Sequence, residues 1–511
     1  MCGIGGVLNS NNLDIVEIML PIKKRGESFN EFKIINNSII SCNRLKIIDR
    51  DYAKQPISNE DNTKYIIFNG EIYNYKKIKS NLIKKGHKFK TDSDTETILH
   101  GFEEYGVNIL NKLDGQFAFL IVDAKKNNYF AARDHFGIKP LFFGIKNKSK
   151  ERFIVSEAKQ IINICDKIIE IKPGQYIDSG KIKYYYKLPK TNKNHNNLNV
   201  IKKNIKQYFN ESVKKRVNTD LKIGVFLSGG IDSTLLLHTA LKYHTNVTAI
   251  AVGKKDSSDM LVAEKYCTEN NIKLIKYVIP EDYNLLEYIP NMVYSSESFE
   301  PNMINQFYFS HIMSKIAYKN GFKVVLCGEG ADELFAGYPE FNICPLSKVK
   351  QISLAFFKNL YKTQLQRVDR ASTSNTIEVR VPFFDRKLVE YVLNIDSKLK
   401  IKNKITKWIL REAFRDELPS YIVDRPKVVM SEGAGFGGNS HDKGVFSKYI
   451  NRNISDKDLN LFKNKYKKYD LNYKDEIYCF KYFLKYGFTK IKLTKRPLVN
   501  RNNSLKWFVW I

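Results

Sequence analysis

The 511-residue chain lacks long apolar runs and has little cysteine and few arginines. No stretch of about 18 apolar residues occurs, so no membrane span is expected. The start of the chain has neither a basic region nor an apolar stretch long enough for a secretory signal. The seven cysteines are odd in number and scattered, which argues against a disulfide framework and for a reducing, cytoplasmic compartment. Hydrophobic residues make up 43% of the chain, which excludes a largely disordered protein.

Arginine is scarce even though the formal net charge is +30, because only 16 of the 84 basic residues are arginine. A charge of this size would ordinarily suggest a nucleic-acid partner. Arginine, however, is the better reader of phosphates and bases. We therefore interpret lysine runs such as residues 463–468 as solvated faces and expect no specific nucleic-acid partner.

The hydrophobic pattern changes near residue 190. Residues 2–188 contain short alternating or apolar runs broken by turn residues, which predict antiparallel strands, together with a helix over 95–104 and another after Tyr73. This pattern indicates an α+β domain. Examples of the expected strands are residues 33–41, 65–68, 116–122 and 128–132. Residues 189–200 are polar and aperiodic and are interpreted as a linker.

Residues 201–511 show a different rhythm, in which apolar strands alternate with helices. This predicts an α/β domain with a doubly wound parallel sheet, whose ligands lie at the carboxyl ends of the strands. The part from about Leu346 onward is predicted to be mainly helical. Strands are expected over 221–227, 246–252, 272–279 and 322–327, with helices over 231–243, 259–270 and 304–318.

The second residue is a cysteine. A small residue at this position allows Met1 to be removed, so that the chain would begin with a thiol and a free α-amino group on Cys2. That amine has an ordinary pKa of about 7.7–8.0 and can take the thiol proton. The thiolate is the nucleophile, and an adjacent base activates it. Cys2 alone is also compatible with a small buried residue at the start of a strand.

Three further stretches carry groups that a glutaminase needs. Arg44 is expected at the head of an apolar strand, Asn69 and Gly70 in a turn that ends a strand, and Asp94 in an acidic turn before a helix. The chemistry requires a cation for the α-carboxylate of glutamine, an acid for its α-amino group and donors for the oxyanion. Arg44, Asp94, and the Asn69 side chain with the Gly70 N–H match these roles. A surface arginine, a helix cap and a hairpin turn are the alternatives.

Together with Cys2 and with residues 131–141 (Ala-Ala-Arg-Asp-His-Phe-Gly-Ile-Lys-Pro-Leu), these stretches resemble the class II, N-terminal-nucleophile glutamine amidotransferase domain. The resemblance implies a four-layer αββα sandwich. It assigns Cys2 as the nucleophile, Asn69 and Gly70 as the oxyanion hole, and the glutamine contacts to Arg44, Asn69, Gly70, Glu71 and Asp94. One loop departs from the family, since Arg25-Gly26-Glu27-Ser28 stands where Arg-Gly-Pro-Asp is usual.

A loop between a predicted strand and a predicted helix reads Leu-Ser-Gly-Gly-Ile-Asp-Ser over residues 227–233. Backbone N–H groups at a helix N-terminus bind phosphate oxygens. No Gly-Lys-Ser/Thr follows, so this is not a Walker A loop. The loop resembles that of ATP pyrophosphatases, and a plain strand-to-helix turn is the alternative. The resemblance implies that pyrophosphate is cradled by Ser228, Gly229, Gly230 and Ser233, and that Asp232 helps to hold Mg²⁺.

A second loop after a predicted strand, residues 327–338, contains three carboxylates, which suit metal binding or acid–base chemistry beside a polyphosphate. Asp332 is the second expected Mg²⁺ ligand, and a solvated acidic turn is the alternative. Lys427 is expected to neutralise charge on the α-phosphate, although a surface lysine is the simpler interpretation of that residue alone.

The order of the two halves resembles glutamine-hydrolysing asparagine synthetases. The resemblance implies that ATP activates the side-chain carboxylate of aspartate as an adenylate and that ammonia made at Cys2 displaces AMP. It assigns Glu329 to the ammonia attack and Lys427 to the adenylation step. It also implies a homodimer. The nucleotide is expected to contact backbone groups of Phe226, Val252, Cys327 and Gly328.

Departures from the family pattern concern the acceptor. Asn305 lies in an Ile-Asn-Gln-Phe stretch where Ile-Arg-Ala-Ser is usual, and Asn342 ends a Pro-Glu-Phe-Asn stretch where Tyr-Phe-His-Lys is usual. Cys327 replaces a common serine. The same architecture acting on another carboxylate, such as a sugar acid, is therefore an alternative, and an inactive or regulatory binding protein is a third.

Overall fold

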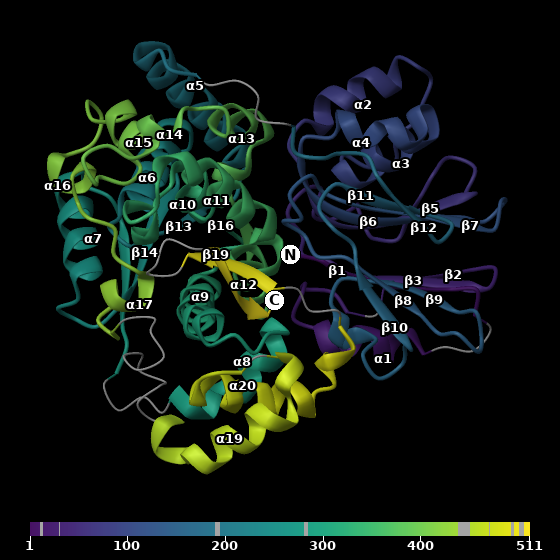
Figure 1. The fold of residues 1–511 in the computed structure, drawn as a ribbon. Helices are drawn as coiled ribbons and strands as arrows, with labels where there is room; N and C mark the ends of the chain where they lie inside the picture. Colours follow the sequence, from purple (N-terminus) through teal and green to yellow (C-terminus); the bar gives the residue numbers. More distant parts are fainter. Residues whose placement is uncertain are drawn as a thin grey trace. The chain divides into compact units, whose positions relative to one another are not determined.

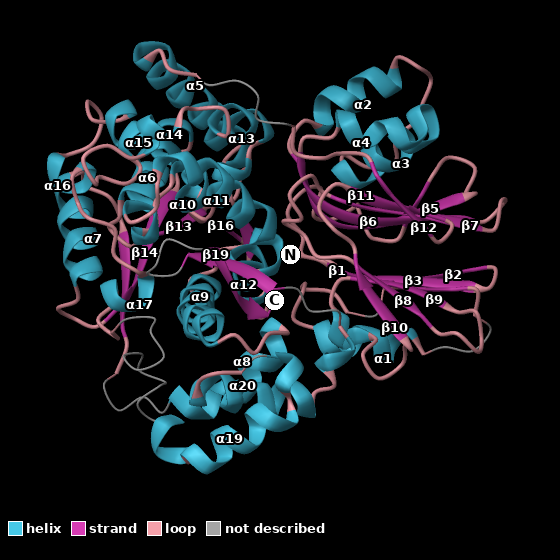
Figure 2. Ribbon diagram, viewed as in Figure 1, coloured by secondary structure: helices cyan, strands magenta, loops and turns pink. Residues whose placement is uncertain are grey.

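The computed structural model describes residues 1–10, 14–29, 31–189, 195–280, 285–437, 450–469 and 471–491, and the strands at 495–499 and 505–510. The chain forms two compact units. Unit 1 comprises Met1–Leu188 with Thr373–Thr376 and Gly487–Lys492, and unit 2 comprises Pro189–Ser372, Ile377–Tyr486 and Leu493–Ile511. Figure 1 follows the chain through both units and Figure 2 distinguishes their helices from their strands.

Unit 1 contains two six-stranded antiparallel sheets. The first has the order β10-β8-β9-β1-β3-β2 and the second the order β12-β11-β7-β6-β5-β4. Helix α1 (Ile15–Met19) covers the first sheet, while α2 (Tyr75–Ile83), α3 (Asp94–Tyr105) and α4 (Ile109–Lys112) cover the second (Figure 1). The predicted four-layer α+β sandwich is thereby confirmed. The strands are β1 (Gly3–Leu8), β2 (Phe32–Ile35), β3 (Ser38–Asn43), β4 (Ile57–Ser58), β5 (Lys64–Ile72), β6 (Gly115–Asp123), β7 (Asn128–Arg133), β8 (Phe142–Ile145), β9 (Arg152–Val155), β10 (Lys167–Glu170), β11 (Gln175–Asp178) and β12 (Lys181–Tyr184).

The two sheets of unit 1 approach each other closely at β1. A Cβ atom on Gly6 would lie 2.3 Å from Cδ2 of Leu120 on β6, so only glycine allows this contact. All six residues of β1 are buried. The strand is therefore held on both sides of the sandwich, and the residue that precedes it, Cys2, has a fixed position.

Three local predictions in unit 1 are wrong. Residues 33–41 are not one strand but the hairpin of β2 and β3, because Asn36 adopts a left-handed φ of 51°. The chain does not turn at Asn69 and Gly70: β5 continues to Ile72, and glycine at position 70 serves close strand approach, since its Cβ would lie 2.1 Å from the Gln116 carbonyl oxygen. Arg44 follows β3 directly and heads no strand.

Unit 2 is built on a five-stranded sheet in the order β15-β14-β13-β16-β17, with every neighbouring pair parallel. Because β13 and β16 are neighbours, the strand order reverses between them, and such a switch point opens a crevice at the carboxyl ends. The predicted doubly wound sheet is confirmed. Its elements are β13 (Ile223–Phe226), α6 (Ile231–Tyr243), β14 (Val247–Gly253), α7 (Ser258–Glu269), β15 (Leu274–Val278), α8 (Ile289–Ser296), α9 (Pro301–Lys319), β16 (Val324–Leu326), α10 (Ala331–Phe335) and β17 (Glu378–Arg380).

The C-terminal part of unit 2 is mainly helical, as predicted, but it also supplies the edge strand β17. Glu378 and Arg380 are both buried in this three-residue strand and form an ion pair with a 2.7 Å Nε–Oε1 distance. Of the predicted linker, residues 190–194 lie outside the described residues, and α5 (Leu198–Arg216) begins within its remainder, capped by Asn197. Other helices here include α11 (Leu346–Asn359), α12 (Gln364–Thr373), α13 (Arg386–Val392), α15 (Trp408–Ala413), α16 (Ser420–Val423), α17 (Met430–Gly433), α19 (Asp456–Lys465) and α20 (Lys474–Lys485). Among the helices described, none combines the length and the apolarity needed to cross a bilayer.

Candidate active sites

The thiol of Cys2 lies buried at the entrance to β1. The backbone N–H of Leu45 donates to its Sγ at 3.3 Å. On the other side, Nε of Arg25 donates to the Cys2 carbonyl oxygen at 3.0 Å, and Arg25 is itself ion-paired with Glu157. These contacts fix both the backbone and the sulfur of Cys2, so the thiol is held in one orientation.

A second thiol, that of Cys42 on β3, sets the acidity of Cys2. Its hydrogen bond to Cys2 is the largest influence and lowers the pKa of Cys2 to about 6, although burial opposes the shift. The positive chain terminus, the Leu45 N–H and the Arg44 guanidinium lower it further. Burial and the neighbouring Cys2 sulfur raise the pKa of Cys42 well above its ordinary value. Cys2 is therefore mostly thiolate at neutral pH, with Cys42 as a neutral donor.

Replacing Cys42 tests this donor role. In Cys42→Ala the Cys2 thiolate loses a hydrogen bond, so we expect its pKa to rise above 6 and its alkylation by iodoacetamide to begin at higher pH. The measurement is the rate of Cys2 alkylation against pH, followed by peptide mass spectrometry. Cys165→Ala, which removes a buried thiol elsewhere in unit 1, is the matched control. An unchanged midpoint in Cys42→Ala would contradict the assignment.

Asn69 on β5 has the features of an oxyanion donor. Its side chain is fully buried, and within the described part of the chain neither Nδ2 nor Oδ1 has a hydrogen-bond partner. Such groups are costly unless a ligand satisfies them. The thiol of Cys42 lies 3.8 Å from the carbonyl oxygen of Phe68, the residue before Asn69, and so connects the Cys2 region of one sheet with the Asn69 region of the other.

The remaining predicted glutamine contacts divide into an acidic group and one arginine. Asp94, at the start of α3, accepts the Ile72 N–H at 3.0 Å. Burial, followed by the charges of Asp94 and Glu71, raises the pKa of Tyr75 to about 12, so both carboxylates face this phenol. They form an acidic end suited to an α-amino group.

Arg44 forms more hydrogen bonds within the protein than the sequence suggested. Its guanidinium donates to the carbonyl oxygens of Ile48, Asp49 and Arg50 at 2.7–3.2 Å, which occupies three of its five N–H donors. The buried guanidinium still provides a cation, and it also holds the loop that follows it.

The loop of residues 25–28, which departs from the family pattern, contacts the backbone of Arg44. Backbone N–H groups of Glu27 and Ser28 donate to the Arg44 carbonyl oxygen at 2.8 and 3.3 Å. The Ser28 hydroxyl accepts the Arg44 N–H at 3.1 Å. Gly26 has a φ of +141° and packs against the backbone of Asn43, where a Cβ would come within 2.6 Å. The substituted loop is thus anchored to the residue that it borders.

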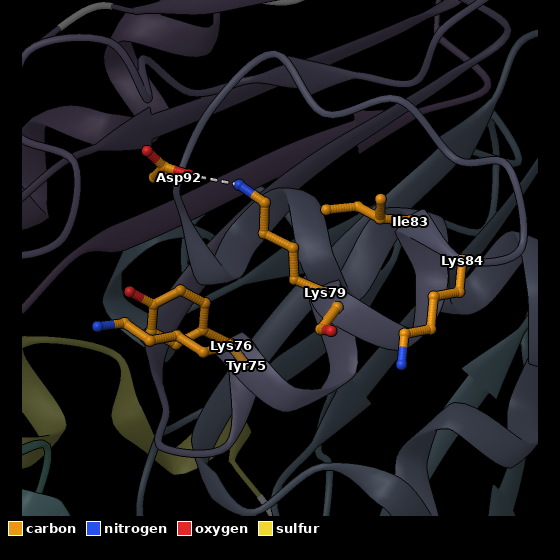
Figure 3. Close-up of a pocket in the computed structure, with 7 residues that line it drawn as sticks. Tyr75, Lys76, Lys79, Ile83, Lys84 and Asp92 are labelled. Atoms are coloured by element: carbon orange, nitrogen blue, oxygen red, sulfur yellow. Dashed lines mark hydrogen bonds and ion pairs between the residues drawn. The ribbon is translucent and has the colours of Figure 1, made fainter.

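A pocket on α2 borders the acidic group through Tyr75. It has a volume of about 540 Å³ and is lined by Tyr75, Lys79 and Asp92 among others (Figure 3). The Lys79 ammonium lies 2.5 Å from the Asp92 carboxylate, as Figure 3 shows. Of the predicted glutaminase residues, none is among those lining it. We assign it no part in the chemistry.

In unit 2 the phosphate loop lies between β13 and α6. Gly229 has a φ of +66°, and a Cβ there would meet Val262 of α7 at 2.8 Å, so glycine is required. The hydroxyl of Ser233 accepts the Ser228 N–H at 3.1 Å and donates to the Gly230 carbonyl oxygen at 3.2 Å. The loop is preformed around the N-terminus of a 13-residue helix.

The second loop, residues 327–330, follows β16 and adjoins the first. A Cβ on Gly328 would lie 3.2 Å from Cβ of Asp232, so the two strand ends meet at the switch point. They share a pocket of about 370 Å³. Its lining includes these predicted residues of the synthetase half: Phe226, Ser228, Asp232, Ser233, Val252, Cys327, Gly328, Glu329, Asp332 and Lys427.

The two expected metal carboxylates, Asp232 and Asp332, come together around a residue that the sequence analysis missed. The ammonium of Lys407, at the start of α15, pairs with Asp232 and lies 2.6 Å from Asp332 Oδ1. Lys427 Nζ lies 2.8 Å from Asp332 Oδ2. Burial raises the pKa of Asp332, but the two ammonium groups outweigh it and hold that pKa well below its usual range. The same attraction raises the pKa of Lys427 above that of a free lysine, so Lys427 is charged.

These carboxylates fit Mg²⁺ as well as lysine. Oxygen ligands suit this ion, which typically binds one or two carboxylates together with substrate phosphates. Oδ1 of Asp232 is buried and has no hydrogen-bond partner in the part of the chain that the structure describes. An unsatisfied carboxylate oxygen beside a phosphate loop is the donor such an ion would use.

Glu329 is held by an arginine that the sequence analysis also missed. Arg367 of α12 pairs with Glu329 through Nη2 and donates to Gln306 Oε1 through Nη1 at 3.0 Å. Arg367 is 3% exposed, so the pair is desolvated. Glu333 lies nearby, where burial and the Asp332 charge raise its pKa to about 7. Of these two carboxyl groups, Glu329 lines the pocket, whereas Glu333 is not among its described lining residues.

Only some of the residues that depart from the family pattern line the pocket. Gln306, Pro339 and Glu340 line it, whereas Asn305 and Asn342 are not among its described lining residues. Asn305 is buried in α9. The pocket therefore carries a neutral amide, Gln306, and a carboxylate, Glu340, where the family pattern has other residues.

Removing Lys407 should destabilise unit 2. Lys407→Met leaves two partly buried carboxylates without their shared, fully buried cation, and we expect the free energy of unfolding to fall by about 3 kcal/mol. Added Mg²⁺ should raise the Tm of the variant more than that of the wild type, since a dication replaces the ammonium. Thermal and denaturant unfolding measure both effects. Exposed Lys398→Met is the control, and equal stability of the two variants would contradict the prediction.

The geometry defines a class of protein: a glutamine amidotransferase unit joined to a nucleotide-binding α/β unit. A glutamine amidotransferase domain profile matches residues 1–212, and an asparagine synthase profile matches 204–351 and 345–471. A putative glutamine-hydrolysing asparagine synthetase of Methanocaldococcus jannaschii is 32% identical and covers 85% of this chain and 94% of its own length. Asparagine synthetase 2 of Oryza sativa is 31% identical over 85% of this chain and 78% of its own. The chain belongs to the glutamine-hydrolysing asparagine synthetase family.

Proposed function

We propose that this protein makes asparagine from aspartate, ATP and glutamine, releasing glutamate, AMP and pyrophosphate. The observation that carries the proposal is the pocket at the switch point of unit 2, where a preformed phosphate loop meets Glu329, Asp332 and Lys427. Family membership and the acidified Cys2 thiol support the coupling to glutamine.

In the glutaminase reaction, the Cys2 thiolate attacks the side-chain amide carbon of glutamine. Asn69 Nδ2 and the Gly70 N–H stabilise the oxyanion, Asp94 and Glu71 bind the α-amino group, and Arg44 provides the cation for the α-carboxylate. Once Met1 is removed, the Cys2 α-amino group gives a proton to the departing ammonia. Water then cleaves the thioester to glutamate.

In the synthetase reaction, the aspartate side-chain carboxylate attacks the α-phosphorus of ATP and pyrophosphate leaves. The nucleotide is held by backbone groups of Phe226, Val252, Cys327 and Gly328. The loop of Ser228, Gly229, Gly230 and Ser233 cradles the departing pyrophosphate, and Lys427 neutralises the charge that develops on it.

Ammonia then attacks the acyl carbon, Glu329 accepts a proton, and AMP departs. The ion pair with Arg367 orients Glu329 for this step. Bound Mg²⁺, held by Asp232 and Asp332, would supply further neutralisation of phosphate charge.

Mass spectrometry of the products tests the proposal. With glutamine, ATP and Mg²⁺, we expect pyrophosphate release to depend on aspartate and to yield equal amounts of asparagine and AMP. Pyrophosphate release only with another carboxylic acid would overturn aspartate as the acceptor, and ADP in place of AMP would overturn the adenylate. Glutaminase activity assayed alone separates the two halves.

The cytoplasm as compartment and a homodimer as assembly are part of the same proposal. All seven cysteines are free, which suits a reducing compartment. The dimer rests on the family alone. Light scattering of the purified chain tests it, and a monomeric mass would exclude it.

A further inference from the structure

Two histidines and two glutamates of unit 1 converge at a place that the glutaminase chemistry does not use. Glu60 lies in the turn between β4 and β5, His87 in the loop after α2, and His100 and Glu103 on α3. One ligand atom from each lies within 4.8 Å of the corresponding atom of every other. We propose that these four side chains form a binding site for a zinc ion.

The short contacts in the cluster have the spacing of metal ligands. His100 Nδ1 is 3.0 Å from Glu103 Oε2 and 3.2 Å from Glu60 Oε2, and His87 Nδ1 is 3.2 Å from Glu60 Oε1. Tetrahedral nitrogen and oxygen ligands at 2.0–2.2 Å from zinc are about 3.4 Å apart. Small side-chain rotations therefore bring all four donors to one ion.

The second nitrogen of each imidazole faces a carboxylate outside the cluster. His100 Nε2 is 3.4 Å from Glu96 Oε1, and both side chains are fully buried. His87 Nε2 is 3.7 Å from Glu104 Oε2. Metal-bound histidines typically donate their other N–H to such a group, which fixes the tautomer and orients the ring. Both rings thus present Nδ1 to the centre and Nε2 to a carboxylate.

The carboxylate ligands are oriented in the same way. Asn59 Nδ2 donates to Glu103 Oε1 at 2.6 Å, and the Lys88 N–H donates to Glu60 Oε1 at 3.1 Å. Each glutamate therefore keeps Oε2 directed at His100 Nδ1. Two nitrogens with two carboxylate oxygens suit zinc, whereas Mg²⁺ prefers oxygen ligands alone.

The site would have a structural role. Four protein ligands complete a tetrahedral shell and leave no position for a catalytic water. The ion would tie the β4–β5 turn and the loop after α2 to α3, the helix that begins at Asp94. Glu60 is the most exposed ligand, so zinc has a path from solvent.

Zinc titration of the chelator-treated full chain, against a chromophoric competitor, tests the proposal. We expect one tight equivalent per chain, little competition from Mg²⁺ and a higher Tm with zinc. Substitution by Co²⁺ should produce visible tetrahedral d–d bands without thiolate charge transfer. No stoichiometric zinc binding, which would leave only an ion-pair network, overturns the site. Thiolate charge-transfer bands, which would indicate Cys2 and Cys42, also overturn it.

Variants locate the ion. His87→Gln and Glu60→Gln change two ligands that are not fully buried and should abolish the tight equivalent, while Glu104→Gln should weaken it about ten- to a hundredfold. His238→Gln is the matched control, because His238 also lies 3.6 Å from a glutamate, Glu417, but among the described residues belongs to no cluster of three or more potential metal ligands. Unchanged binding in His87→Gln and Glu60→Gln would overturn the proposal. The Co²⁺ spectrum of the wild type decides the case if the variants do not fold.

Discussion

Cys2→Ala should lose glutamine-dependent asparagine formation almost completely, by about 10⁴- to 10⁶-fold, because removing an enzyme's nucleophile has effects of this size. Alanine is chosen over serine because serine retains a hydroxyl that can attack. The Leu45 N–H and the Arg25 contact to the backbone remain, so the local fold should persist. The measurement is glutamate release from glutamine and asparagine formation in the same sample.

Ammonium chloride supplies the control for Cys2→Ala. Since unit 2 contains the whole nucleotide pocket, asparagine formation from ammonium should match that of the wild type. Cys165→Ala, whose buried thiol has a pKa raised to about 12 by burial, should leave both nitrogen sources in use. Peptide mass spectrometry should show that Met1 is absent from active wild-type protein. Substantial glutaminase activity in Cys2→Ala would disprove the nucleophile.

The pH dependence of the glutaminase follows from the same thiol. With Met1 in place Cys2 has a pKa of about 6, and the α-amino group that Cys2 carries once Met1 is removed also favours the thiolate, so the thiolate fraction is nearly complete at neutral pH. The acidic limb of glutaminase kcat/KM should therefore have its midpoint near 6 rather than near the ordinary thiol value. In Cys42→Ala the midpoint of this limb should move to higher pH.

The hydrophobic periodicity of the sequence predicted the fold class of both units but not every strand boundary. The helix over 231–243 was predicted with its observed ends, because its apolar spacing and the preceding glycines both indicate the same start. The prediction of a turn at Asn69-Gly70 was wrong, and it was made because this dipeptide is common in hairpin turns. Glycine is needed at position 70 because β5 and β6 approach closely there, and β6 is distant in sequence.

The sequence motifs identify the residues of the loops but not the charged side chains and thiol that contact them. Lys407 lies 75 residues beyond Asp332, and in so lysine-rich a chain nothing distinguishes it. Arg367 had a better signal, as one of 16 arginines, but its contact with Glu329 requires α12 to approach the loop that follows β16. Cys42 is adjacent to Cys2 only because β1 pairs with β3. Such contacts are set by tertiary packing, which local pattern does not encode.

Lys427→Met should reduce aspartate-dependent pyrophosphate release about 10²- to 10³-fold, as expected when one charge-stabilising group is removed. Lys427 Nζ lies 2.8 Å from Asp332 in the pocket and its side chain is 26% exposed, so a nucleotide can reach it. The effect should fall on kcat for adenylation, measured as pyrophosphate release and ATP–pyrophosphate exchange. Glutamine hydrolysis, assayed separately, should be retained.

Two comparisons separate charge neutralisation from structural support. Lys427→Arg keeps the cation and should recover more of the rate than Lys427→Met. Lys407→Met should instead lose stability, because Lys407 is 1% exposed and is bound to both carboxylates, whereas Lys427 touches one of them. Two results together would contradict this role: a Tm for Lys427→Met as low as that of Lys407→Met, and no recovery of activity in Lys427→Arg. Lys427 would then be a second structural cation. The charge on the leaving pyrophosphate would have to be neutralised by the phosphate loop and Mg²⁺ alone.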